Sequence, residues 1–262
     1  MIKIFDEKFK IRVSNFLRQT IELDAIAFNF VKSNGDGNLN AYLNKLIPNL
    51  LKLKKERRAD IVEYAKNEFN TETLKAEEAE KIINGLSTLF ERIYFSDDEL
   101  DELSETIWIR PTKGNIPVFD EIMENETEIT GLEMSVYIRG LLNEYSRLPR
   151  YKKEQIVFTE ECSITLCARD NEKILKFRYE GELHRAFVFS CVYNYLEEQG
   201  NFFLCFDIGK NIICRYQISE VDALHVLDKK YNPSDAILKL CQKYYDDGMW
   251  INDEIIEIGD NV

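Results

Sequence analysis

Residues that mark metal sites, disulfide scaffolds and disordered tails are scarce in this 262-residue chain. It has 2 histidines, 11 glycines and 5 prolines. A chain so poor in glycine and proline has little room for long disordered stretches. None of the six cysteines forms a Cys-x-x-Cys pair, and two histidines are too few for the usual zinc-ligand sets. We therefore expect reduced cysteines in the core and neither a metal nor a cofactor.

Long apolar runs and catalytic motifs are also missing. No stretch of about 18 apolar residues is present, so no membrane span is predicted. Residues 1–6 lack the apolar core of a secretion signal. The chain has no motif of a phosphate-binding loop, a serine hydrolase or a zinc protease, and both histidines, His184 and His225, lie in strand-like runs. We expect a cytoplasmic protein that has no membrane partner and is not an enzyme.

Positive charge is in the minority, but it is concentrated at the N-terminal end. The net charge is −13. Residues 1–58 nevertheless carry 12 Lys and Arg against 6 Asp and Glu, whereas residues 59–105 carry 4 against 14. Because exposed charges are screened beyond about 8 Å at physiological salt, the local field decides what binds. The basic end can therefore meet phosphate, while the acidic remainder weakens non-specific binding to nucleic acid.

The first 150 residues contain an internal repeat. Residues 40–47 (NAYLNKLI) match residues 135–142 (SVYIRGLL), with a tyrosine and the following aliphatic residues at the same positions. Upstream of each segment lies a short strand-like run, residues 9–14 (FKIRVS) in one case and residues 107–112 (IWIRPT) in the other. Such self-similarity indicates two related structural units.

Each unit is predicted to fold as strand, helix, turn and helix. Apolar and polar residues alternate over residues 9–14, which is the period of a half-buried strand. A helix is expected over about residues 15–29, and a second helix from about Leu39 with Asn38 as its N-cap. In the second unit the matching helix continues to about Arg147, where the approaching proline ends it.

This order of elements resembles a ribbon-helix-helix DNA-binding unit. In that family two strands pair into an antiparallel ribbon that enters the major groove, and the N-terminus of each second helix holds a phosphate. The resemblance implies six base-reading residues: Lys10, Arg12, Ser14, Trp108, Arg110 and Thr112. Arginine suits a forked contact to guanine. The two strands are expected to pair either within one chain or between two chains, and Pro111 weakens the second strand because it lacks an N–H.

A second basic segment lies further along, over residues 52–58 (KLKKERR). A run of this kind is usually a solvated helix face, and the alternative is that it lies along a nucleic-acid backbone. Residues 59–105 follow as an acidic, helical connector.

From about residue 174 the hydrophobic period switches to two. Strands are predicted over residues 174–179, 184–195, 201–207 and 212–218, separated by turn residues. Short strands at regular spacing indicate a small, strongly curved antiparallel sheet or barrel.

This region resembles a WYL domain, a small SH3/Sm-like barrel found in bacterial regulators, over roughly residues 160–230. The aromatic-aromatic-Leu signature falls on residues 202–204 (FFL). In that family a basic and aromatic pocket senses a ligand or a single strand of nucleic acid, since arginines hold phosphate while rings stack on bases. The resemblance implies four pocket residues: Tyr179, Arg185, Phe203 and Arg215.

The predicted fold class is therefore α+β: a ribbon-helix-helix-like helical region, a small β-barrel and a short C-terminal extension. A helix is expected after Ser234, while residues 250–256 form either a strand or a dimer contact. The expected domains are residues 1–58 (first unit), 59–105 (connector), 106–150 (second unit), 151–232 (WYL-like barrel) and 233–262 (extension).

Three functions are compatible with these features. The first is a DNA-binding transcriptional regulator whose barrel senses a ligand or a nucleic-acid signal. The second is a single-stranded-RNA-binding accessory factor that modulates an effector nuclease, because the combination of domains resembles the WYL accessory proteins of type VI-D CRISPR systems. The third is a protein-interaction module that offers its acidic surface to a basic partner. The expected partners are duplex DNA or single-stranded RNA, an effector protein, and a second copy of the chain.

Overall fold

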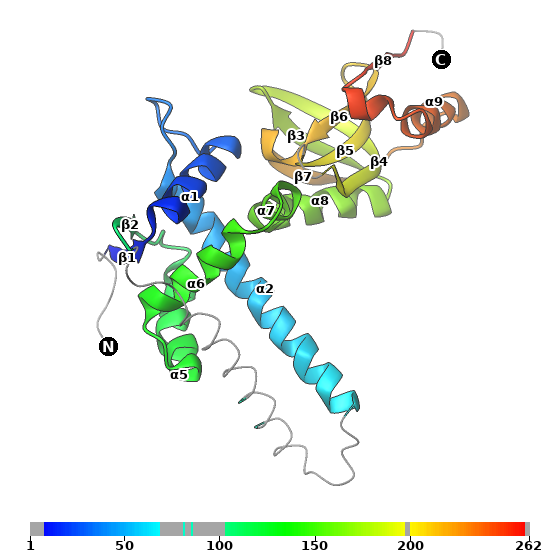
Figure 1. Ribbon diagram of the computed structural model, residues 1–262. Coiled ribbons are helices and arrows are strands. Elements are labelled where there is room, and N and C mark those ends of the chain that lie inside the picture. The colour runs from blue at the N-terminus through cyan, green and yellow to red at the C-terminus, as the bar shows by residue number, and fades with distance from the viewer. Residues whose placement is uncertain (1–7, 69–80, 82–84, 86–102, 197–199, 260–262) are drawn as a thin grey trace. The chain divides into compact units, whose positions relative to one another are not determined.

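The computed structural model describes residues 8–68, 81, 85, 103–196 and 200–259. The chain divides into two compact units, residues 1–147 and residues 148–262, and each has its own core (Figure 1). Helices and sheets occur in both units, so the α+β class is confirmed. Among the described residues, every helix is too short or too polar to cross a lipid bilayer.

A two-stranded antiparallel ribbon opens the first unit. Strand β1 (Phe9–Val13) pairs with β2 (Glu105–Ile109), and the register places Lys10 opposite Trp108. The ribbon therefore forms within one chain, which was one of the two predicted arrangements. The second strand begins two residues earlier than predicted and ends before Pro111, because a proline there has no N–H for the ladder.

Helices follow β1 as the sequence predicts. Helix α1 (Asn15–Ala27) is N-capped by Ser14, whose side chain accepts a hydrogen bond from the Leu17 N–H at 3.1 Å. Helix α2 (Leu39–Glu68) begins after Asn38, whose side chain accepts from the Ala41 N–H at 3.3 Å. Such caps satisfy donors that have no partner inside the helix. The part of the predicted connector beyond Glu68 lies largely outside the described residues.

The chain after β2 repeats this order. A helical path runs through α4 (Ile116–Glu121), the π-helical turn η2 (Ile122–Glu126) and α5 (Thr127–Thr130). Gly131, with φ of 67°, then turns the chain into α6 (Met134–Ser146).

The core of the first unit is built from the inward faces of the ribbon and helices. Its most buried members include Ile11, Val13, Leu17, Ile21, Tyr42, Leu46, Ile107, Ile109, Phe119, Tyr137, Leu141 and Tyr145. Helix α6 packs against β1 while α2 packs against β2, so each second helix lies on the strand of the other half. This crossed packing explains why the two repeats form one unit.

The second unit starts with helices α7 (Arg150–Val157) and α8 (Thr159–Asp170), which the sequence analysis did not identify. The sheet that follows has the order β7-β3-β4-β5-β6-β8, with antiparallel neighbours throughout. Its strands are β3 (Lys173–Tyr179), β4 (Glu182–Leu196), β5 (Gly200–Asp207), β6 (Ile212–Gln217), β7 (Val221–Lys230) and β8 (Ile256–Glu257). Of these, β3 to β6 were predicted and β7 was not.

The sheet of the second unit is open. Strands β7 and β8 are its two edges, and the described residues contain no pairing between them that would close a barrel. The predicted helix after Ser234 is α9 (Asp235–Asp246), capped by that serine. Trp250 lies in the 3-10 turn η4 (Met249–Asn252) and is buried, and the strand alternative for residues 250–256 is met only at Ile256, where β8 begins.

Alternating residues of the central strand serve two different cores. Helices α7 and α8 pack against β3, β4, β5 and β7. Phe202, Leu204 and Phe206 instead join a cluster with Tyr244 of α9 and Trp250 of η4. Because successive strand side chains point to opposite faces, the intervening Phe203 and Cys205 belong to the other face. Both faces of β5 are therefore buried, which explains its nearly continuous apolar sequence.

Candidate nucleic-acid interface

The outward face of the β1–β2 ribbon is basic and carries an exposed aromatic ring. Lys10 and Arg12 are exposed, and Trp108 is 52% exposed. The Lys10 ammonium lies 5.9 Å from the centroid of the Trp108 ring, a cation–π distance. Ile11 and Ile107, on the inward face, are almost fully buried. The buried face fixes the orientation of the ribbon, so the outward side chains project from a rigid platform.

Lys10, Arg12 and Trp108 lie on this outward face, and Arg110 continues it just beyond the end of β2, whereas Ser14 and Thr112 do not belong to it. Ser14 is the N-cap of α1, so its hydroxyl oxygen already serves a backbone N–H. Arg110 and Thr112 lie beyond the end of β2, with exposed side chains. Lys8, exposed just before β1, was missed by the sequence analysis although it continues the alternation of Lys10 and Arg12.

The chain after β2 is held by two asparagines of α2. The side-chain oxygen of Asn40 accepts from the Arg110 N–H at 2.7 Å, and that of Asn44 accepts from the Thr112 N–H at 2.7 Å. The Asn44 amide also donates to the Arg110 carbonyl at 2.9 Å. These bonds replace the strand pairing that Pro111 prevents, and they fix Arg110 at the end of the ribbon.

The two helix N-termini that the family resemblance assigns to phosphate differ from one another. The first turn of α2 contains no acidic residue, and Asn38 is its cap. The cap of α6 is the exposed Glu133, which makes no side-chain cap bond. An anionic side chain at a helix N-terminus competes with a phosphate for the positive end of the dipole. Only α2 therefore has an N-terminus suited to an anion.

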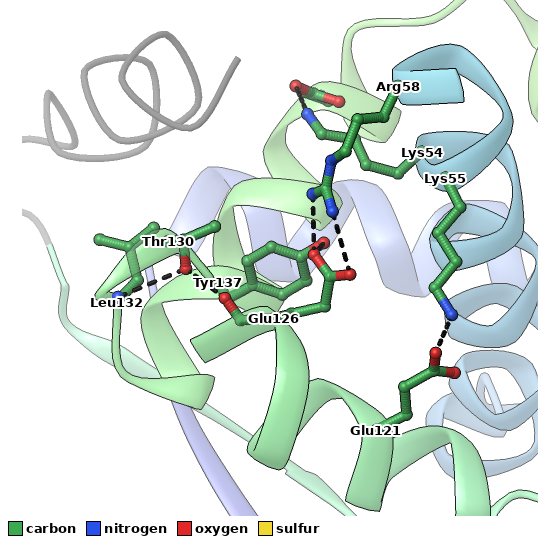
Figure 2. A network of polar contacts seen from close by, with 9 residues as sticks. Lys54, Lys55, Arg58, Glu121, Glu126, Thr130, Leu132 and Tyr137 are labelled. Carbon is green, nitrogen blue, oxygen red and sulfur yellow. Dashed lines mark hydrogen bonds and ion pairs between the residues drawn. The ribbon is translucent and has the colours of Figure 1, made fainter. Parts of the chain in front are cut away.

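The second basic segment, residues 52–58, is occupied by internal ion pairs (Figure 2). Lys54 pairs with Glu144 of α6 at 3.1 Å, and Lys55 pairs with Glu121 of α4. Arg58 pairs with Glu126 at 2.9 Å. The alternative that this run lies along a nucleic-acid backbone is therefore disfavoured, since three of its five cations join α2 to the second repeat.

Glu126 is the centre of this network. Its carboxylate is almost fully buried and accepts hydrogen bonds from both terminal nitrogens of Arg58 and, at 2.9 Å, from the Tyr137 hydroxyl. Thr130 donates to its backbone carbonyl at 2.6 Å (Figure 2). A buried carboxylate needs such a set of donors. The network is structural: it ties η2 to α2 and α6.

The four predicted pocket residues of the second unit do not form one pocket. Phe203 is fully buried, and its ring packs against Phe177 at 5.3 Å and Tyr216 at 5.7 Å between ring centroids. The expectation that Phe203 offers a stacking surface to a ligand is therefore corrected: it is a core residue. Tyr179, whose ring centroid is 5.0 Å from that of Tyr216, joins the same aromatic cluster and is half-buried.

Arg215 points to the opposite face from Phe203. Tyr216 lies directly across from Phe203 in the β5–β6 ladder, so the two side chains share one face of the sheet. Arg215 precedes Tyr216 along β6, and its side chain therefore points to the other face. Its guanidinium stacks over the Phe202 ring at 4.4 Å, and Nε donates to Asp253 at 3.0 Å. Its side chain is only 14% exposed. Arg215 therefore holds the C-terminal segment to the sheet.

The surroundings of Arg215 are acidic. Burial, reinforced by the negative charge of Asp253, raises the pKa of Glu220, and Arg215 partly offsets this effect. Burial is the larger cause of this shift, and Asp253 adds a carboxylate beside Arg215. The predicted phosphate-binding role of Arg215 is disfavoured, because its guanidinium is paired with Asp253 and largely buried.

Arg185 lies in a different setting, on the outward side of the β3–β4 hairpin. It is exposed and stands directly across from Lys176. Arg178 is exposed on the same face of β3, two residues further along. These three cations form a second basic patch. The sequence signal was the alternation of Lys176 and Arg178 with apolar residues, which the prediction used only to assign the strand.

A buried polar cluster lies beside the aromatic cores of the second unit. The Asp207 carboxylate accepts from His184 Nδ1 at 2.6 Å and from the Tyr216 hydroxyl at 2.9 Å. Its other oxygen accepts from the backbone N–H groups of Gly209 and Lys210, which shapes the β5–β6 turn. Burial is the main cause that raises the pKa of Tyr216. The cluster fixes three strands through hydrogen bonds among their side chains.

Comparisons with known proteins find a similar fold but do not identify a family. No protein-family model and no curated protein sequence matches the chain. One solved structure, described as that of a CRISPR Cas-related protein, superposes with a TM-score of 0.68 over 95% of this chain and 73% of that one, at 14% sequence identity. At so low an identity the likeness concerns the fold, and this chain shares its architecture with that CRISPR Cas-related protein.

Proposed function

We propose that this chain is a nucleic-acid-binding regulatory protein that acts by binding rather than by catalysis. The observation that carries the proposal is the outward face of the β1–β2 ribbon, where Lys10 and Arg12 flank the exposed ring of Trp108. Cations beside an exposed ring provide both a phosphate contact and a stacking or apolar contact to a base.

The arrangement of ribbon and helices supports a ribbon-helix-helix mode of binding. Each strand is followed by a helix and then by a second helix packed on the strand of the other half. A two-stranded ribbon fits the major groove of duplex DNA. In this mode Lys10, Arg12 and Arg110 face the groove, and the N-terminus of α2 meets a phosphate.

The biological setting that we propose is a CRISPR system. The support is the fold shared with a protein described as CRISPR Cas-related, together with the resemblance of the sequence to WYL-containing accessory proteins. In that setting the chain is either a transcriptional regulator or a factor that binds single-stranded RNA and modulates an effector nuclease. The ribbon supports the first option, and the basic patch of Lys176, Arg178 and Arg185 offers the second option a separate contact surface.

The test compares duplex DNA with single-stranded RNA at two salt concentrations. Arg12→Ala is expected to weaken binding to duplex DNA about tenfold, because one phosphate or guanine contact is lost. Lys239→Ala is the matched control, since Lys239 is an exposed cation on α9 in the other unit. Fluorescence anisotropy with labelled oligonucleotides measures both.

The outcomes separate the proposed modes. Arg185→Ala is expected to weaken the binding of single-stranded RNA, while Arg12→Ala leaves that binding largely unchanged. If Arg12→Ala and Lys239→Ala have the same small effect on every nucleic acid, the ribbon is not the contact surface. If the intact chain binds neither nucleic acid, the protein-interaction function takes the place of this proposal.

A further inference from the structure

The ribbon has an internal two-fold relation that the sequence and the register define independently. The sequence match pairs residues 9–14 with residues 107–112, so Lys10 corresponds to Trp108. In the antiparallel ladder the same two residues stand directly opposite each other. A residue that lies across from its own counterpart marks the position of a local two-fold axis. That axis therefore passes between Lys10 and Trp108.

The second helices obey the same relation. The repeat matches Asn44 of α2 with Arg139 of α6, and Arg12 with Arg110. The Asn44 amide donates to the Arg110 carbonyl at 2.9 Å, and the Arg139 guanidinium donates to the Arg12 carbonyl at 3.2 Å. The corresponding residues thus bind corresponding carbonyls of the two strands. These contacts relate the two halves as a two-fold axis relates the subunits of a dimer, although one chain supplies both.

The side chains on the outward face do not share this symmetry. Arg12 corresponds to Arg110, which keeps a cation at both ends of the face. At the axis, however, a lysine stands across from a tryptophan. Lys8, on the first side, corresponds to Thr106 on the second. At two of the three paired positions, therefore, the first repeat has a cation where the second has an uncharged side chain.

The helix ends break the symmetry in the same direction. The α2 N-terminus has no acidic residue in its first turn, whereas the α6 N-terminus begins at the exposed Glu133. The repeat with fewer ribbon cations, the second, is therefore also the repeat whose helix N-terminus is less suited to phosphate. Ribbon and helix ends together give one strongly basic half, with Lys8 and Lys10, and one weakly basic half that presents Trp108.

We infer that the ribbon reads an asymmetric duplex element, one that is not its own reverse complement. This inference rests on the proposed function and adds the class of target. A ribbon built from two identical chains presents the same side chains to both half-sites and therefore fits a palindrome. Here Lys10 suits a guanine edge, while the apolar ring of Trp108 suits a thymine methyl. Trp108 is therefore the residue that sets the orientation of the target.

The first experiment selects duplexes from a random library with the intact chain. Native mass spectrometry then identifies the shortest element that binds one chain. That element is expected to lack two-fold symmetry, and a palindromic element at one chain per duplex would overturn the inference. Counting chains is necessary because two chains on an inverted repeat also give a palindrome, each chain contacting one asymmetric copy.

The second experiment exchanges the two residues at the axis in the double variant Lys10→Trp, Trp108→Lys. Both side chains lie on the outward face, so circular dichroism should report an unchanged fold. Affinity for the selected element is expected to fall at least fivefold, since the exchange reverses the pair of side chains at the axis while the target and the other ribbon residues keep their orientation. Unchanged affinity would mean that the two halves read equivalently, and the inference would be wrong.

Single variants keep the test decisive if the exchange disturbs folding. Trp108→Ala is expected to relax base preference in one half of the element, and Lys10→Ala to do so in the other. The corresponding pair Arg12→Ala and Arg110→Ala should instead affect the two halves to a similar degree. Failure to bind any nucleic acid would overturn the proposed function itself, whereas binding only to single-stranded RNA would overturn the asymmetric duplex and leave nucleic-acid binding in place.

Discussion

One buried carboxylate shows how much of the second unit depends on single residues. Glu154 of α7 is fully buried and accepts four hydrogen bonds. The donors are the backbone N–H and side-chain amide of Asn201, the side-chain amide of Gln217 and the backbone N–H of Ser219. Glu154 therefore joins a helix to β5, to β6 and to the turn that follows. Such a fully satisfied buried group specifies one packing arrangement.

Gly200, at the start of β5, is required by this carboxylate. Its φ is 96°, and a Cβ there would lie 2.5 Å from Glu154 Oε2 and 2.8 Å from Gln217 Nε2. Gly200→Ala is expected to lower the free energy of unfolding by about 3 kcal/mol, because it adds backbone strain and displaces the hydrogen-bonded carboxylate. Urea denaturation measures the loss.

Gly181 supplies the matched control for that substitution. Its φ of 81° is also in the left-handed region, but a Cβ there has nothing within 4 Å. Gly181→Ala is expected to cost only about 1–2 kcal/mol, from backbone strain alone. Equal losses for the two variants would show that contact with Glu154 contributes nothing.

At the scale of elements, helix α2 connects the two repeats through charge. Three of its cations pair with acidic residues of α4, η2 and α6. The pairs differ in burial: the side chains of Arg58 and Glu126 are 17% and 3% exposed, whereas those of Lys52 and Glu56 are 67% and 60% exposed. Exposed pairs contribute little to stability, and breaking a buried pair is costly.

Glu126→Gln is therefore expected to lower the free energy of unfolding by about 3 kcal/mol, since Arg58 loses its counter-charge in a mostly buried position. Glu56→Gln makes the same chemical change in the exposed Lys52–Glu56 pair of α2, the helix that also carries Arg58. It is expected to change the free energy of unfolding by less than about 0.5 kcal/mol. Thermal unfolding of both variants measures the difference. A loss for Glu126→Gln as small as that of the control would show that the network is not a structural tie.

At the scale of the whole molecule, the distribution of charge matters more than its sum. The chain has a net charge of −13, yet the ribbon face gathers Lys8, Lys10, Arg12 and Arg110 at one place. An acidic protein whose cations gather on short patches repels polyanions over most of its remaining surface, which lowers non-specific binding and leaves a short electrostatic contact at the ribbon.

Four cations predict a specific dependence on salt. The logarithm of the duplex association constant is expected to fall with the logarithm of salt concentration at a slope of about −3 to −4, because about four phosphates release their counterions. Arg12→Ala should reduce the magnitude of the slope by about 1. Fluorescence anisotropy titrations at salt concentrations from about 50 to about 200 mM measure this slope. A slope near zero would contradict contact through the ribbon.

Local signals along the chain account for the secondary structure and for the residue types on the outward face of the ribbon. Alternation over residues 9–13, the caps Ser14, Asn38 and Ser234, and the two-residue period of β3 to β6 are local signals, and the structure confirms the elements they predict. The internal repeat also indicated that the two strands belong together. These features depend on neighbours along the chain, and neighbours are visible in a sequence.

Which charged and aromatic side chains remain accessible to a binding partner depends on the tertiary structure. Lys54, Lys55 and Arg58 find carboxylates more than 60 residues away, Arg215 finds Asp253, and Phe203 turns inward. The choice of the intrachain ribbon, its shift by two residues and the open edge of the sheet were likewise decided by long-range pairing. A sequence shows that a side chain can bind an anion, but whether an internal partner already occupies it depends on contacts between distant segments.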